Sequence, residues 1–94
     1  MIDDADRLLA TSRARGERVA LATALDGERA GARLLVWSAG HTFGDLGWPR
    51  LNQRVALYAE QLFERGASAV STKKFDLPGA ARVEIRVELF LPGA

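Results

Sequence analysis

The stretch RVEIRVEL, residues 82–89, alternates strictly between charged and apolar side chains and decides the fold class of this chain. Successive side chains of a β-strand point to opposite faces of the sheet, so a period of two predicts one core face and one solvent face. A strand with one wetted face is typical of an antiparallel sheet. We therefore predict a strand over residues 81–91, with Val83, Ile85, Val87, Leu89 and Leu91 in the core and Arg82, Glu84, Arg86 and Glu88 facing solvent.

Four further segments carry strand signals and complete the expected sheet. Residues 69–75 precede the alternating strand and are joined to it across residues 77–79, where Pro followed by Gly favours a type II turn. Residues 18–25, RVALATAL, form an apolar run ahead of an Asp-Gly turn, which is typical of a strand buried on both faces. Residues 32–38 and 42–44 follow after short turns, so we expect a three-stranded meander in this half of the chain.

Two segments carry helical signals. Residues 3–15 have aspartates in the first turns and arginines in the last turn, which suits the helix macrodipole. Residues 49–65 begin with proline, end before Gly66 and repeat apolar side chains at helical spacing: Leu51, Val55, Tyr58, Ala59 and Leu62. This order predicts an α+β fold in a single domain, residues 1–94, with both helices on one face of a mainly antiparallel sheet of about five strands.

The composition excludes several classes of function. The chain has 94 residues, no cysteine and a net charge of +1. Without cysteine there is no disulfide framework or thiolate metal site, and the balanced charge gives no electrostatic reason to expect a nucleic acid or a membrane as partner. The sequence contains no Walker loop, no dinucleotide fingerprint and no nucleophile–base pair. We expect no catalytic or metal-binding residues, and a cytoplasmic location because the N-terminus lacks the basic start of a signal peptide.

The segment GHTFGDLGWPR, residues 40–50, is the strongest candidate for a binding site. Its glycines stand at a passage from strand to helix, where exposed backbone amides at the positive end of a helix can hold an anion. Arg50, in the first helical turn, would add a charge-assisted contact. The alternative, which the pattern alone favours, is that the glycines and proline only shape a tight connection.

Two other features have simpler interpretations. His41 is the only histidine, and in a Gly-His-Thr turn it is expected to be an exposed turn residue. The charges of residues 82–88 are expected to form a solvated cross-strand ladder, with Lys73 and Lys74 opposite.

The order of these motifs resembles the N-terminal domain of XdhC/CoxI proteins. The resemblance is carried by RVALATAL (18–25), GARLLVWSAG (31–40), GDLGWPRLNQRVALYAEQLFERG (44–66) and VEIRVELFLPG (83–93). Gly44 and Gly47 match the glycine-rich turn of that family, whereas Trp48 and Pro49 replace glycines and Asn52 replaces a glutamate. The loop at 26–30 is shorter than in the family, and the Rossmann-like domain of longer members is expected to be missing.

The resemblance implies an accessory or maturation factor for molybdenum hydroxylases of the xanthine or carbon monoxide dehydrogenase type, and not an enzyme. It implies molybdenum cofactor, a pterin, as the ligand, and a molybdenum hydroxylase or a longer XdhC-type protein as the partner. We also expect a homo-oligomer. The predicted cofactor-binding residues are Arg33, Gly44, Asp45, Gly47, Trp48 and Arg50. The alternative is a non-catalytic docking or dimerisation adaptor that has lost cofactor binding.

Overall fold

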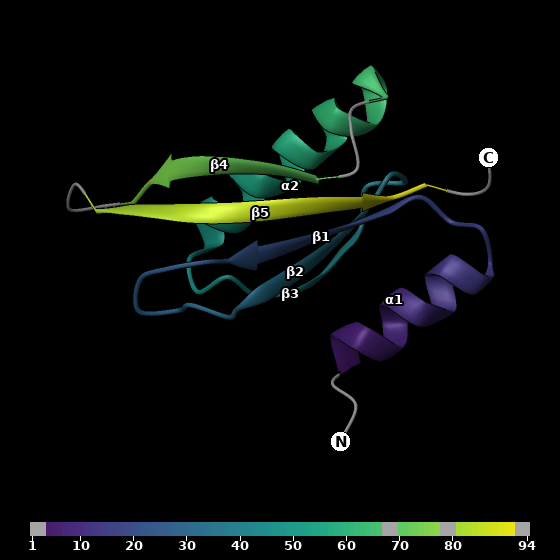
Figure 1. Ribbon diagram of the computed structural model, residues 1–94, viewed down its shortest axis with the longest axis horizontal. Coiled ribbons are helices and arrows are strands. Elements are labelled where there is room, and N and C mark those ends of the chain that lie inside the picture. The colour runs from purple at the N-terminus through teal and green to yellow at the C-terminus, as the bar shows by residue number, and fades with distance from the viewer. Residues whose placement is uncertain (1–3, 67–69, 78–80, 92–94) are drawn as a thin grey trace.

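A computed structural model describes residues 4–66, 70–77 and 81–91 and has the α+β fold expected from the sequence (Figure 1). The elements follow the order α1 (Asp4–Ala14), β1 (Val19–Ala24), β2 (Arg33–Trp37), β3 (Thr42–Gly44), α2 (Pro49–Arg65), β4 (Val70–Asp76) and β5 (Arg82–Phe90). All strand pairs are antiparallel, in the order β3-β2-β1-β5-β4. The meander β1–β2–β3 is therefore confirmed, and β5 returns beside β1 in the centre of the sheet.

The two helices cover opposite faces of the sheet, so the prediction that both lie on one face is wrong (Figure 1). The helix α2 packs on the face formed by alternate residues of the central strands: Ala20, Ala22, Ala24, Leu34, Val36, Val83, Ile85, Val87 and Leu89. The helix α1 packs on the other face, against Val19, Leu21, Leu35 and Trp37. Because β1 and β2 are apolar on both faces, each face needs its own cover.

The contact between α1 and the sheet includes two polar links. The indole N–H of Trp37 donates a hydrogen bond of 2.8 Å to the hydroxyl of Ser12, and both residues are buried. At the other end of α1, the Arg33 guanidinium donates from Nη1 to Asp6 Oδ1 at 2.6 Å. These bonds fix a helix whose apolar stripe is thin, since only Ala5 and Ser12 of α1 are buried.

The strand β5 has the predicted alternation, with Val83, Ile85, Val87 and Leu89 buried. The prediction fails at Leu91, which follows the strand and is 48% exposed. Of the expected ladder, Lys74 lies opposite Glu84, but Lys73 lies opposite Ile85 on the α2 face, where its ammonium group lies 4.8 Å from the Tyr58 ring centroid. Of the predicted turn at 77–79, residues 78 and 79 lie outside the described residues.

The helix α2 has the predicted bounds. Pro49 is at its first turn, and Gly66 ends it in the left-handed conformation with φ +61°, a C-cap for which glycine is favoured. Its buried residues are Leu51, Val55, Ala59, Leu62 and Phe63, whereas Tyr58 is only half-buried. Within the described residues, neither helix has the length and apolar character needed to cross a membrane.

Candidate functional site

The connection from β3 to α2, residues 44–50, has the glycine-dependent backbone that the sequence predicts. Gly44 and Gly47 have φ values of +110° and +105°, a region that side chains other than glycine rarely adopt. At Gly44 the backbone of Arg33 also approaches so closely that a Cβ would meet its carbonyl oxygen. Both glycines are therefore required by the path of the chain, whatever the turn binds.

Two polar side chains accept hydrogen bonds from amides of this connection. Asp45 Oδ1 accepts hydrogen bonds from the Gly47 N–H at 2.7 Å and from Asn52 Nδ2 at 3.0 Å. Asn52 Oδ1 in turn accepts from the N–H of buried Leu46 at 2.8 Å. The expectation that the glycine amides face outward to an anion is wrong for Gly47, because its N–H is already bonded within the turn.

The pKa of the Asp45 carboxyl is lowered below its ordinary value, chiefly by the hydrogen bond from Asn52 and then by the Gly47 N–H. The positive charge of Arg29 also favours the ionised form. Arg29 comes from the loop between β1 and β2, and its side chain packs against Gly47. This arginine was not among the predicted site residues, because no local pattern in the sequence relates residue 29 to the turn.

The first turn of α2 remains open. Trp48 occupies the N-cap in an extended conformation with no side-chain cap, and its carbonyl accepts the first helical hydrogen bond from the Asn52 N–H at 3.0 Å. The N–H groups of Arg50 and Leu51 precede this first helical bond, so they have no acceptor within the helix. The positive end of the helix macrodipole lies beside them. The exposed Arg50 side chain adds a full positive charge at the same place.

Two cavities flank this helix start and share Leu77. One, here called the tryptophan cavity, has a volume of about 300 Å³ and is lined by Gly27, Glu28, Trp48, Leu77, Ala81, Arg82 and Val83. The other, the arginine cavity, has a volume of about 360 Å³ and is lined by Arg50, Leu51, Arg54, Asp76 and Leu77. In the arginine cavity, Arg54 Nη1 donates to the Asp76 carbonyl at 3.2 Å, and its guanidinium lies 5.8 Å from the Phe75 ring centroid.

The structure brings five of the six predicted site residues together. Gly44, Asp45, Gly47, Trp48 and Arg50 all belong to the connection and the helix start. The Arg33 side chain does not join them, since it is paired with Asp6 of α1 on the opposite face of the sheet, although the Arg33 carbonyl accepts from the Asp45 N–H. Sequence reasoning also missed Arg54, although its position one helical turn after Arg50 is a local signal that could have identified it.

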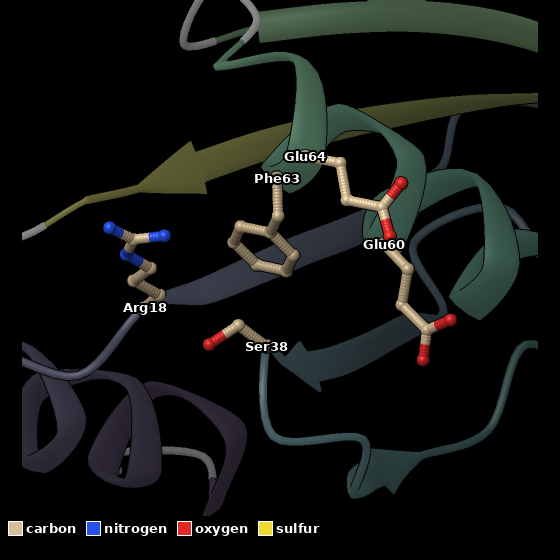
Figure 2. A pocket seen from close by; sticks show the side chains of 5 residues that line it. All are labelled: Arg18, Ser38, Glu60, Phe63 and Glu64. Atoms are coloured by element: carbon tan, nitrogen blue, oxygen red, sulfur yellow. The ribbon is translucent and has the colours of Figure 1, made fainter.

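A separate cavity of about 350 Å³ lies where β1 begins and β2 ends beneath the second half of α2 (Figure 2). Its lining combines Arg18, Ser38 and Phe63 with two carboxylates one helical turn apart, Glu60 and Glu64. Figure 2 shows Arg18 on one side of the Phe63 ring and the glutamates on the other. This lining contains no histidine.

His41 is exposed, as expected for a turn residue, and its ring stacks on Trp37 at a centroid distance of 4.4 Å. In the part of the chain that the structure describes, no group of three or more His, Asp or Glu side chains could hold a metal ion.

Comparison with models of known protein families gives a match. The model of the XdhC and CoxI family matches residues 12–76, which run from the end of α1 through β4 and include the whole connection and both arginines of the arginine cavity. The strand β5 lies outside the matched residues, so the resemblance of residues 83–93 stays a prediction. No curated protein matches the chain.

Proposed function

The chain belongs to the XdhC and CoxI family, and from this membership we propose that it is a non-catalytic accessory factor in the maturation of molybdenum hydroxylases. The proposed client is an enzyme of the xanthine or carbon monoxide dehydrogenase type, or a longer XdhC-type protein that acts on one. The proposed cargo is molybdenum cofactor, whose pterin is planar and whose side chain carries an anionic phosphate. A cytoplasmic location is part of the proposal.

The observation that carries the proposal is the pair of cavities at the start of α2. An indole lines one cavity and two guanidinium groups line the other, with Leu77 common to both. An indole face suits a planar ring, and guanidinium groups suit a phosphate through charge-assisted hydrogen bonds. The residues present thus fit the organic part of such a cargo.

The roles of the predicted residues follow from this arrangement. We assign ring stacking to Trp48 and recognition of the anionic group to Arg50, with Arg54 beside it. Gly44, Gly47 and Asp45 would keep the connection in shape, because Asp45 is occupied by bonds within the turn. Arg33 has no proposed contact with the cargo, since its side chain is paired with Asp6.

The test is a calorimetric titration of the full chain with a molybdopterin-type ligand. Replacing Arg50 by Ala should weaken binding by about 1.5–3 kcal/mol, roughly tenfold to hundredfold, the range for a hydrogen bond to a charged group. Arg86→Ala is the matched control because Arg86 is exposed and lines neither cavity. Arg82, which also lies on the charged strand face, is unsuitable as a control because it lines the tryptophan cavity.

One observation favours the alternative, a docking or dimerisation adaptor. The Asp45 carboxylate lies where an anion would approach, and it already holds the Gly47 N–H. Equal affinities for wild type, Arg50→Ala and Arg86→Ala, or binding by none of them, would support the adaptor and refute cofactor handling. Self-association belongs to both versions of the proposal.

A further inference from the structure

The two edges of the sheet differ in how they are protected. The edge strand β4 is seven residues long and presents Lys73 and Lys74, and charged side chains of this kind discourage pairing with another chain. The opposite edge strand, β3, has no such protection. All three of its residues are exposed, and residues 38–44 contain no Lys, Arg, Asp or Glu.

The hydrogen bonds of β3 show which of its backbone groups face outward. The His41 carbonyl accepts from the Trp37 N–H, and the Asp45 N–H donates to the Arg33 carbonyl. Because a trans peptide directs its C=O and N–H to opposite sides, the Thr42 N–H and the Gly44 C=O must point away from β2. The alternation of an antiparallel ladder directs the Thr42 C=O and the Gly44 N–H the same way.

These outward groups are complementary under a two-fold axis. We propose that two copies of the chain pair through β3 in antiparallel register, with the axis at Phe43 and Thr42 of each copy opposite Gly44 of the other. Each Thr42 N–H then donates to a Gly44 C=O of the second copy, and each Gly44 N–H donates to a Thr42 C=O. The two five-stranded sheets become one continuous sheet across the axis.

Registers shifted by one residue in either direction are less favourable. They would pair Gly44 with Gly40 or Thr42 with Leu46, and the N–H groups of both neighbours are already used within the chain. The Gly40 N–H donates to the Trp37 carbonyl, and the Leu46 N–H donates to Asn52. Only the register centred on Phe43 engages all the outward groups of β3.

The side chains at this axis also match. Phe43 is 40% exposed and would face its own copy across a non-hydrogen-bonded pair, in which side chains approach most closely. The same register places His41 of each copy opposite Asp45 of the other, so a hydrogen-bond donor meets a carboxylate. Antiparallel pairing of two copies through β4, centred on that strand, would instead place Lys73 of one copy opposite Lys73 of the other. Like charges directly opposite each other are destabilising.

This inference rests on the proposed self-association and is independent of cofactor handling. The test exploits the lack of native cysteine, which makes Phe43→Cys a chain with a single thiol. Residues opposite each other in a non-hydrogen-bonded pair have Cα atoms about 4.5 Å apart, within the range of a disulfide. Under mild oxidation, Phe43→Cys should form covalent dimers about tenfold faster, or more, than Leu57→Cys, a control at the exposed surface of α2.

A second variant tests the backbone pairing. Thr42→Pro removes an N–H that faces solvent in the monomer, a position where an edge strand tolerates proline. It should abolish the dimer in sedimentation velocity and slow the cross-linking of Phe43→Cys, whereas the circular dichroism spectrum should stay unchanged. The control Thr42→Val keeps the N–H and should behave as wild type. Equal cross-linking rates for Phe43→Cys and Leu57→Cys would overturn the inference.

The outcomes also separate the inference from self-association as such. A wild-type dimer that Thr42→Pro leaves intact would overturn pairing through β3 while another surface holds the copies together. A wild-type chain that stays monomeric at millimolar concentration, with no preference for cross-linking at residue 43, would overturn both. Neither outcome bears on the calorimetric test of cofactor binding.

Discussion

Replacing Asn52 by Ala should destabilise the fold, because this side chain connects the β3–α2 turn to the helix. Its Oδ1 accepts from the N–H of Leu46 at 2.8 Å, and its Nδ2 donates to Asp45 at 3.0 Å. Leu46 is fully buried, so water has little access to the N–H group that the substitution leaves without an acceptor. A polar group left unsatisfied in this way costs about 1–3 kcal/mol.

One effect opposes this loss. Alanine has a higher helix propensity than asparagine, by roughly half a kcal/mol in a helix interior. We therefore expect a net decrease of about 1–2 kcal/mol in the free energy of unfolding. For a domain of this size each kcal/mol corresponds to a decrease of about 4–8 °C in Tm.

Urea unfolding, followed by tryptophan fluorescence and by circular dichroism, measures this change. Gln53→Ala is the matched control, because Gln53 is the next residue of α2, is exposed and has no role in the turn. The control should lie within about 0.5 kcal/mol of wild type, as exposed substitutions usually do. If Asn52→Ala lies within that range as well, the bonds of Asn52 contribute nothing to stability and the reasoning fails.

Three further outcomes are expected. Ser12→Ala should lower the free energy of unfolding in urea by about 1–3 kcal/mol, because the N–H of the buried Trp37 indole loses the Ser12 hydroxyl as acceptor; an unchanged free energy would contradict this. Gly44→Ala should lower Tm more than Gly40→Ala. Both glycines have positive φ, but of the two only Gly44 has a carbonyl oxygen against its Cβ position, so equal decreases in Tm would contradict this contact. Because the pKa of Asp45 is lowered in the folded chain, its carboxylate stabilises the fold at pH values above the ordinary pKa of 3.8, and this stabilisation is lost as the pH falls. The urea midpoints of wild type and Asp45→Asn should therefore differ at neutral pH and converge in acid.

Local periodicity predicted the elements of the fold but not the face that each helix covers. The bounds of α2 follow from Pro49, Gly66 and an apolar stripe, all of which are local signals. The position of α1 depends on tertiary contacts, since its stripe would suit either face of the sheet. The apolar run of β1 predicts burial on both sides. Because the described part of the chain has two helices, that burial requires one helix on each face.

The candidate site shows the same division. The glycines of the turn were predictable because positive φ has a local residue preference, and the bond from the Gly47 N–H to Asp45 is a two-residue Asx contact of a recognised kind. The approach of Arg29 to the turn and the pairing of Arg33 with Asp6 were not predictable. Both contacts are between residues distant in the sequence. Hydrophobic periodicity and helix-capping patterns give no information about contacts of this kind.

The β3–α2 turn and the start of α2 offer different groups to a ligand. Asn52 satisfies the Leu46 N–H and orients Asp45, which satisfies the Gly47 N–H. The N–H groups of Leu46 and Gly47 are therefore not available to a ligand. Trp48 lines a cavity beside the turn. If the proposed cargo binds here, side chains at the helix start must recognise it, and substituting them should change affinity while leaving the turn intact.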